Sequence, residues 1–117
     1  MSKELKDIVD KLLDFRSRRD WEQFHTPKDL AISIAIETAE LLQEFQWKDD
    51  KDVREYLEGK GFESVREEVA DIMIYLLLLC HETGVDIIKA VEDKIRINEQ
   101  KYPADKAKGT AKKYDRL

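Results

Sequence analysis

Two pairs of acidic residues carry the strongest chemical signal in this sequence. Glu37 and Glu40 stand three residues apart, and so do Glu68 and Asp71. On a helix this spacing places both members of a pair on the same face. Both pairs lie in the most apolar stretches of the chain, where a carboxylate is poorly solvated unless its pKa rises or a cation compensates it. Hard divalent cations take oxygen ligands, so the two pairs together indicate a metal site.

A solvated helix face is the competing explanation of these acids, and it is the usual one for a single pair with this spacing. Two pairs in apolar rather than lysine-rich helices make a metal site an equally good explanation. If the two helices pack in antiparallel fashion, both acidic faces can meet. The residues alone therefore predict an acidic helical metal site and no more.

The stretches that carry the acids are predicted to be helices, and the whole chain is predicted to be all-α. Thr26 followed by Pro27 is typical of a helix start, and Ser64 with Glu67 three residues later resembles a capping box. Gly84 is typical of a helix end. These signals and the spacing of apolar residues predict helices over about residues 3–18, 26–46, 50–58, 64–84 and 86–101.

The composition indicates a single domain without a nucleic-acid-binding surface. The chain has 117 residues, 42% hydrophobic and 40% charged, and its net charge of -5 lacks the basic field that nucleic-acid binders use. Cys80, the single cysteine, excludes an intramolecular disulfide and is expected to be an inert buried thiol. The apolar run 72–80 is far shorter than the roughly 20 residues that span a bilayer. We therefore expect a cytoplasmic protein with no membrane partner.

Two of the predicted helices carry more apolar surface than a small domain can bury. Apolar residues cover most of the circumference of helix 26–46 and all of it along 72–80. A helix that is apolar all round must be buried all round, so we predict that subunit contacts cover the outer side in a homo-oligomer. The domain is expected to comprise residues 1–103, followed by a Lys-rich tail, 104–117, that is extended or only partly ordered.

The two acidic pairs also match a known signature. ETAE at residues 37–40 and EVAD at 68–71, with 27 residues between them, resemble the ExxE…ExxD signature of the MazG-like all-α nucleoside triphosphate pyrophosphohydrolases. The segments RDWEQFHTPKDL, ELLQEFQWK, EEVADIMIYLLLL and KIRINEQKYP resemble the dCTP pyrophosphatase branch of that family, in the same order and at similar spacing. The resemblance covers about residues 10 to 103.

The resemblance implies a fold and a reaction. The fold would be a MazG-like four-helix bundle domain completed by oligomerisation, as a tetramer built from two dimers or as a dimer. The reaction would be Mg²⁺-dependent hydrolysis of a dNTP, with dCTP or a related pyrimidine as first choice, to dNMP and pyrophosphate. Mn²⁺ would be an alternative metal. Such an enzyme would cleanse the nucleotide pool.

The resemblance also implies roles for the acids. Carried over residue by residue, the catalytic residues and metal ligands would be Glu37, Glu40, Glu68 and Asp71. One of these carboxylates, or the neighbouring Glu44 or Glu67, would accept the proton of the attacking water.

Aromatic residues are the candidates for binding the base. Trp21 and His25 lie in a link between helices and Trp47 at the end of one, and packing under a loop explains them equally well from the residues alone. The dCTP pyrophosphatase branch encloses the nucleobase with the matching tryptophans, which implies that role for Trp21 and Trp47. His25 would contact the base or only bond its own loop. Tyr75, one turn past Asp71, would donate its hydroxyl at the ribose or phosphate end.

Lys94, Asn98 and Lys101 share one face of the last long helix and suit a triphosphate tail. A solvated basic face is the alternative, and the match to the family's KxxxNxxKYP segment favours the phosphate contact. Lys112 and Lys113 in the tail are expected to be solvated.

Two departures from the family leave the choice of base open. Three residues before Phe15, the vertebrate dCTP pyrophosphatases carry a histidine near the base pocket, where this chain has Leu12, and the linker 48–62 also differs from theirs. Another deoxynucleotide, a modified pyrimidine or broad specificity would fit as well. The alternative functions are a phosphoribosyl-ATP or dUTP pyrophosphohydrolase of the same fold, and a non-catalytic metal-binding helical oligomer.

Overall fold

The computed structural model describes residues 2–117, and the prediction of an all-α protein is confirmed: no strand occurs in that range. The chain forms two compact units, residues 2–84 and 85–117. The first contains α1 (Lys3–Ser17), the 3₁₀ helix η1 (Glu22–Phe24), α2 (Pro27–Phe45), α3 (Asp50–Glu58) and α4 (Gly61–Thr83). The second contains α5 (Ile87–Lys101), α6 (Ala104–Ala107) and the 3₁₀ helix η2 (Tyr114–Arg116). The predicted domain boundary at residue 103 stays a prediction.

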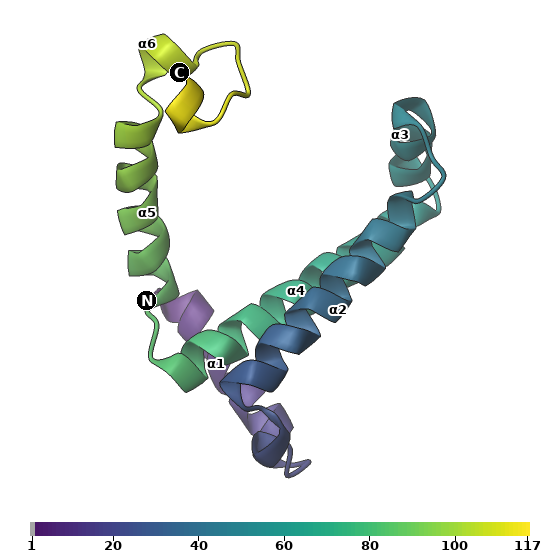
Figure 1. Ribbon diagram of the computed structural model, residues 1–117. Coiled ribbons are helices and arrows are strands. Elements are labelled where there is room, and N and C mark those ends of the chain that lie inside the picture. The colour runs from purple at the N-terminus through teal and green to yellow at the C-terminus, as the bar shows by residue number, and fades with distance from the viewer. Residues whose placement is uncertain (1) are drawn as a thin grey trace. The chain divides into compact units, whose positions relative to one another are not determined.

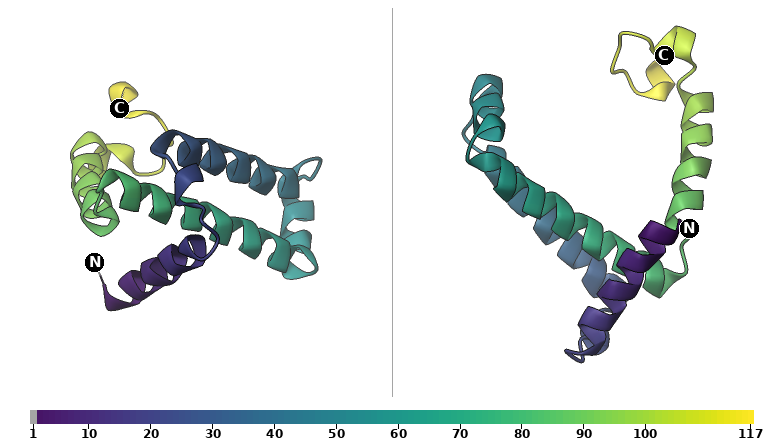
Figure 2. Two further views of the ribbon diagram at one scale, coloured as in Figure 1. Left: turned by 90° about the horizontal axis from the view of Figure 1, so that it is seen from below. Right: turned by 180° about the vertical axis from the view of Figure 1, so that it is seen from behind.

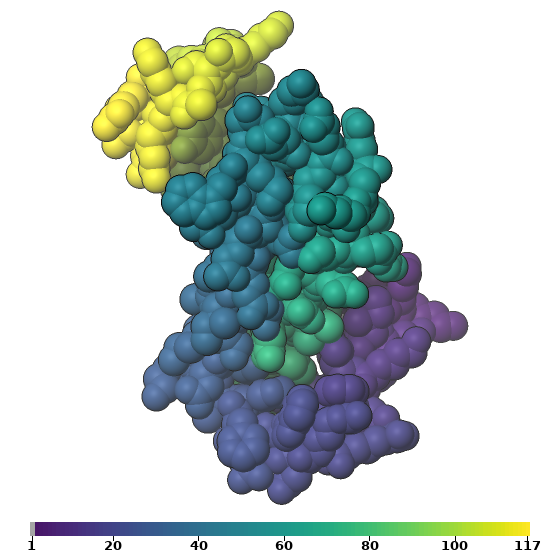
Figure 3. All heavy atoms as spheres, turned by 90° about the vertical axis from the view of Figure 1, so that its right-hand side faces the viewer, coloured from purple at the N-terminus to yellow at the C-terminus, as the bar shows by residue number. Residues whose placement is uncertain are grey.

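The first unit is built on an antiparallel pair of long helices, α2 and α4, which lie side by side along their length (Figures 1 and 2). The short helix α3 joins them at one end and packs on α4, and α1 packs on α4 nearer the other end. In the space-filling view the side chains of α2 and α4 meet along the pair, with α3 at one end (Figure 3). The acids predicted to act together are therefore carried by neighbouring helices.

Local signals set most of the helix ends. The Thr26 hydroxyl accepts a hydrogen bond from the Asp29 amide at 3.2 Å, with Pro27 as the first residue of α2. Gly84 ends α4 in the left-handed conformation, at φ 77°. Apart from the start of α4, the predicted and observed helix boundaries of this unit agree within one or two residues.

The start of α4 differs from the prediction. The helix begins at Gly61 rather than at Ser64, and Ser64 caps nothing, because its hydroxyl donates to Glu44 on α2. Gly61, the first residue of α4, has a packing role. A Cβ at this position would lie 2.3 Å from the ring of Tyr56, so the glycine lets the Tyr56 ring pack on the first turn of α4.

The first unit has a small core and broad apolar surfaces. Its buried apolar residues are Leu30, Leu77 and Leu78, at the end of the α2–α4 pair that α1 covers. Large apolar side chains elsewhere on these two helices are exposed, among them Ile32, Ile36, Leu42, Val69 and Met73. Exposed apolar surface of this extent is typical of interaction sites, in line with the predicted homo-oligomer, which stays a prediction.

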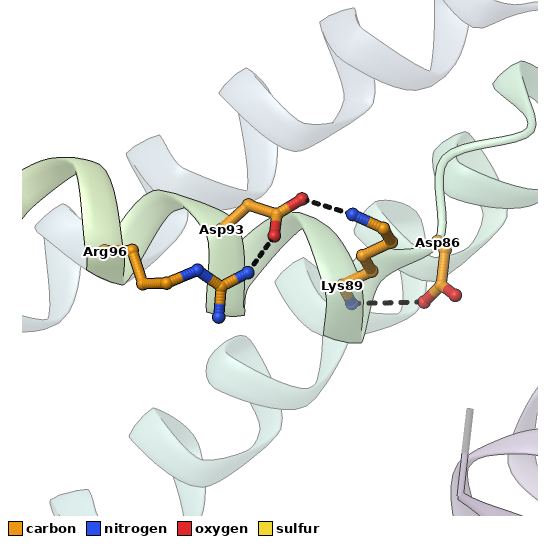
Figure 4. Close-up of polar contacts among 4 residues, drawn as sticks. All are labelled: Asp86, Lys89, Asp93 and Arg96. Carbon is orange, nitrogen blue, oxygen red and sulfur yellow. Dashed lines mark hydrogen bonds and ion pairs between the residues drawn. The ribbon is translucent and has the colours of Figure 1, made fainter.

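The second unit is organised by polar contacts along α5. Asp86 caps the helix by accepting from the Lys89 amide at 3.2 Å, and Asp93 pairs with both Lys89, at 2.7 Å, and Arg96 (Figure 4). Ion pairs of this spacing stabilise an exposed helix.

The C-terminal tail is more ordered than predicted. It forms α6 and η2, and the ring of Tyr114 lies edge-on to that of Tyr102, with centroids 6.1 Å apart. Lys101 Nζ stands 4.8 Å from the centre of the Tyr114 ring, a distance typical of a cation–π contact. These contacts fold the tail back onto the end of α5. Among the residues described, no helix combines the length and the apolar character that crossing a bilayer requires.

Candidate active site

The antiparallel packing of α2 and α4 brings three of the predicted acids together. One carboxylate oxygen each from Glu37, Glu40 and Glu68 lies within 4.8 Å of the other two. A second observation concerns the partners of these oxygens: Oε2 of Glu37 and Oε2 of Glu68 are buried and accept no hydrogen bond. Buried oxygens without a donor are unfavourable unless something else compensates them.

The electrostatics of the cluster show that its negative charges are crowded. Burial, the close Glu40 carboxyl, and the charges of Asp71 and Glu68 raise the pKa of Glu37 to about 7. Burial and the same neighbour, Glu40, also raise the pKa of Glu68. Without a cation, these carboxyls therefore retain protons to a higher pH than ordinary glutamates do.

The donor set fits a hard divalent cation. Three carboxylates from two helices supply only oxygen ligands, and two of their oxygens are free to bind an ion. A bound cation would satisfy the orphaned oxygens and remove the repulsion that raises the pKa of Glu37. A cation at this position would offset the unfavourable free energy of placing carboxylates in apolar helices.

The fourth predicted ligand, Asp71, is not among the three acids whose oxygens cluster. It lies near enough for its charge to raise the pKa of Glu37, and it lines a neighbouring cavity. Its predicted role in holding the metal stays a prediction. Asp71 therefore lies between the acidic cluster and the cavity.

Glu44, a candidate proton acceptor, has a structural role. Its two carboxylate oxygens accept hydrogen bonds from the hydroxyls of Tyr56 and Ser64. These bonds hold the pKa of Glu44 below its ordinary value, and Lys48 Nζ donates to the Glu44 carbonyl at 2.8 Å while lying 4.3 Å from the centre of the Tyr56 ring. A carboxylate with both oxygens engaged and a lowered pKa is a poor base. Glu44 instead ties α3 and the first turns of α4 to α2.

A cavity of about 390 Å³ lies beside the acids, between α1, the link that follows it, and α4. It gathers three of the aromatic residues predicted from the sequence, Trp21, His25 and Tyr75, together with Asp71. The ring centroids of Trp21 and His25 are 6.4 Å apart, and those of His25 and Tyr75 are 6.5 Å apart, both edge-on. A row of flat side chains around a cavity next to the acidic cluster can hold a flat ring.

From α1, the sequence placed only Leu12 near a base pocket, and the other residues that this helix contributes were missed. Lys11, Leu12, Phe15 and Arg16 all line it, and the Phe15 and Trp21 rings meet edge-on at 5.7 Å. Arg16 has a side chain only 7% exposed and is paired with Glu82 at 2.6 Å. The sequence does carry a signal for Arg16, because this cation lies one turn after Leu12 on the apolar face of an amphipathic helix. The acids were identified by the same feature, a charged residue among apolar ones.

Two titratable residues of the cavity keep their neutral forms near pH 7. Burial lowers the pKa of His25 below its ordinary value, and the positive charge of Arg16 lowers it further. Burial raises the pKa of Tyr75, and so do the charges of Glu37, Asp71 and Glu40. A neutral imidazole and a protonated phenol can both hydrogen-bond an uncharged ligand.

The remaining predicted residues do not line the cavity. Trp47 follows α2 in the left-handed conformation, at φ 66°, and is 92% exposed. Lys94, Asn98 and Lys101 are exposed side chains of α5, in the second unit. Their predicted contacts with base and phosphates stay predictions.

The sequence matches a known family over the segment that carries these acids. Residues 32–117 match the MazG-like family, and the chain belongs to this family. The matched segment covers most of α2, all of α4 and therefore the whole acidic cluster.

The chain is also similar to characterised pyrophosphatases. It is 38% identical over 114 residues to dCTP pyrophosphatase 1 of Rattus norvegicus and 37% identical over the same length to dCTP pyrophosphatase 1 of Homo sapiens, covering 97% of this chain and 67% of each relative. The crystal structure of a pyrophosphatase from Archaeoglobus fulgidus is similar with a TM-score of 0.83 and 44% identity, covering 88% of this chain and 95% of that one. These similarities confirm the prediction of a pyrophosphohydrolase, a hydrolase acting on nucleotide anhydrides.

Proposed function

We propose that the chain hydrolyses dCTP, or a related pyrimidine deoxynucleoside triphosphate, to the monophosphate and pyrophosphate with Mg²⁺, and so removes unwanted nucleotides from the pool. The observation that carries this proposal is the position of Asp71 and Tyr75. They lie one turn apart on α4, both line the aromatic cavity, and the charge of Asp71 reaches Glu37 in the acidic cluster. A base in the cavity would therefore leave its phosphates beside the carboxylates. The names of the similar mammalian enzymes support dCTP as substrate.

The acids would act as follows. Glu37, Glu40 and Glu68, with Asp71, would hold the metal, which when bound supplies charge neutralisation of the phosphates and a more acidic water. The water oxygen would bond to the α-phosphorus while the bond from that phosphorus to the bridging oxygen of the β-phosphate breaks, and pyrophosphate leaves with the bond's electrons. A free carboxylate oxygen of the cluster would take the water proton.

The substrate would be positioned by residues from several elements. Trp21 would flank the base, and His25 would hydrogen-bond it in its neutral form. Trp47 lies outside the cavity, so it would flank the base of a site on a second copy of the chain. Tyr75 would donate its hydroxyl to the sugar or phosphate end, because its raised pKa keeps the proton on the phenol. The phosphate contacts would come from α5, through Lys94, Asn98 and Lys101.

The active form would be a homo-oligomer, either a tetramer built as a dimer of dimers or a dimer. Exposed Ile36 on α2 and exposed Val69 and Met73 on α4 lie on apolar surface that a second copy of the chain would cover. A protein that sediments as a monomer at assay concentration would refute this part of the proposal.

The test of the function is a pyrophosphate-release assay with all dNTPs, modified dCTPs and ribonucleotides, in Mg²⁺, in Mn²⁺ and in EDTA. Metal-dependent release of pyrophosphate and a monophosphate, fastest with a pyrimidine deoxynucleotide, is expected. Release of orthophosphate would place the attack at another phosphorus and refute the mechanism. No release from any nucleotide would favour a non-catalytic metal-binding role.

A further inference from the structure

We propose that Arg16 determines base specificity by selecting bases that carry a carbonyl oxygen and rejecting adenine, which carries none. The inference rests on the proposed function, because it assigns the cavity beside the acids to the base of a nucleotide. It concerns a residue of α1, outside the acidic cluster.

The first observation is that the hydrogen-bonding capacity of Arg16 is largely unused. Its side chain is only 7% exposed, and Nη2 pairs with Glu82 at 2.6 Å. Nε and Nη1 are buried and have no hydrogen-bond partner. A guanidinium carries five N–H donors, and leaving a buried donor unpaired is costly. The protein therefore maintains donors at this position that its own side chains do not satisfy.

The second observation is the cavity that Arg16 lines. Its volume of about 390 Å³ lies at the lower end of the range for small-molecule sites. Phe15, Trp21, His25 and Tyr75 supply flat walls. Flat walls with unpaired guanidinium donors beside them are complementary to a flat heteroaromatic ring that presents an acceptor.

Charge argues against a phosphate as the partner of Arg16. Glu82 already balances the guanidinium charge, and the Asp71 carboxylate offsets the ammonium of Lys11, which also lines the cavity. These charges leave no excess positive charge to attract a phosphate. A neutral acceptor satisfies the spare donors without adding charge to a cavity with mostly apolar walls. Nucleobases offer two kinds of neutral acceptor, ring nitrogens and carbonyl oxygens. A carbonyl oxygen projects beyond the edge of the ring, so it is the acceptor that best reaches a guanidinium in the wall of the cavity.

The chemistry of the bases then sets the expected selectivity. Cytosine, uracil, thymine and guanine each carry a carbonyl oxygen, whereas adenine presents ring nitrogens and an amino donor. A site built around a hydrogen bond rejects an analogue that lacks it, because the buried groups of the site stay unpaired. Cytosine, uracil and thymine all carry a carbonyl oxygen at position 2, whatever their substituent at position 4. Arg16 would therefore accept all three pyrimidines.

Arg16 also has a structural contact, and the test must separate the two roles. The matched pair of variants is Arg16→Met, which removes the donors, and Glu82→Gln, which breaks the ion pair and leaves the donors in the cavity. Arg16→Lys is a third variant that keeps a cation if Arg16→Met does not fold. For each we would measure kcat and KM for dCTP and dATP, thermal unfolding, and binding of dCMP and dAMP by calorimetry.

The expected result is a loss of discrimination. The wild type should prefer dCTP to dATP in kcat/KM, and Arg16→Met should reduce that ratio at least about tenfold, mainly through KM for dCTP. Arg16→Lys should reduce it less, and Glu82→Gln should change it less than about twofold. A wild type without preference would overturn the proposal. So would an Arg16→Met variant that loses only thermal stability, to the same extent as Glu82→Gln, with the ratio unchanged.

The binding measurement separates this inference from the proposed function. If no nucleotide is hydrolysed but the wild type binds dCMP better than dAMP and Arg16→Met does not, the proposed reaction fails and the role of Arg16 stands. If nucleotides are hydrolysed and Arg16→Met keeps the wild-type preference, the reaction stands and the role of Arg16 is refuted.

Discussion

Ser64 on α4 donates a hydrogen bond to Glu44 on α2, one helical turn from the place where Glu68 and Glu40 meet across the same two helices. Glu68 follows Ser64 by four residues on α4, and Glu40 precedes Glu44 by four residues on α2. One register of the antiparallel pair therefore allows both contacts. Tyr56 adds a second hydroxyl to Glu44 from α3. The arrangement of the acidic cluster is therefore fixed by a contact between polar residues that are not part of it.

Removing the Ser64 hydroxyl is expected to weaken the site from a distance. Ser64→Ala leaves one oxygen of a charged carboxylate without its donor, which should lower the free energy of unfolding and weaken Mg²⁺ binding. Chemical denaturation and calorimetric titration with Mg²⁺ measure the two effects. Thr38→Ala is the matched control, since the Thr38 hydroxyl bonds the main chain of its own helix at Ile34. Equal metal affinity in Ser64→Ala and wild type would show that the contact does not set the register.

Neutralising one acid of the cluster should separate activity from stability. Glu40→Gln keeps the shape of the side chain and removes a charge, so turnover should fall at least about 100-fold, as expected for the loss of a metal ligand. The metal-free variant should unfold at an equal or higher temperature than wild type, because one charge fewer crowds Glu37 and Glu68. Glu63→Gln, on the exposed side of α4, is the control. Wild-type turnover in Glu40→Gln would refute the metal assignment.

The protonation of His25 gives a test by pH. Burial and the Arg16 charge lower the pKa of His25 in the folded protein, so below about pH 6.5 the unfolded chain binds a proton that the folded chain does not. The stabilisation is complete above pH 6.5 and is lost as the pH falls below it. NMR titration of the imidazole should give a pKa below 6.5, and Arg16→Met should raise it. A His25→Gln variant should show a weaker decline in stability over this pH range. A pKa at or above 6.5 would contradict the burial described for the cavity.

Disrupting the apolar surface of α2 tests the proposed assembly. Ile36→Lys places a charge on an exposed apolar position of this helix, so the assembly should dissociate if a second copy covers it. Sedimentation velocity across a concentration series measures the change. Glu58→Lys, on exposed surface of α3, is the control for the change of charge. If both variants sediment as wild type does, this surface is not the interface.

Local chemistry made much of the fold predictable from the sequence. Signals that act within one turn were read correctly: α2 begins at Thr26 and Pro27, and α4 ends at Gly84, as predicted. Ser64 misled the prediction of a helix start because its partner, Glu44, is distant in the sequence. A pattern that looks local loses its meaning when the residue serves a contact between helices.

The site was predictable to the same extent and for the same reason. Spacing along each helix placed Glu37 with Glu40 on one face, but only the packing of α2 on α4 shows that Glu68 joins them more closely than Asp71 does. Arg16 was not found because its pairing with Glu82 and its place in the cavity depend on how α1 packs. The spacing of apolar residues along a helix does not determine which neighbouring helix its buried face meets.

The acids and several residues that line the cavity lie on different helices. The acids lie on α2 and α4, while Leu12, Phe15 and Arg16, which line the cavity, lie on α1. Under the proposed function, a mutation in α1 can therefore alter which nucleotide fits without touching the carboxylates proposed to carry out hydrolysis. Lineages that keep the same acids could diverge in substrate by exchanging a few side chains of one helix, and a laboratory library confined to α1 would sample new specificities at little risk to the chemistry.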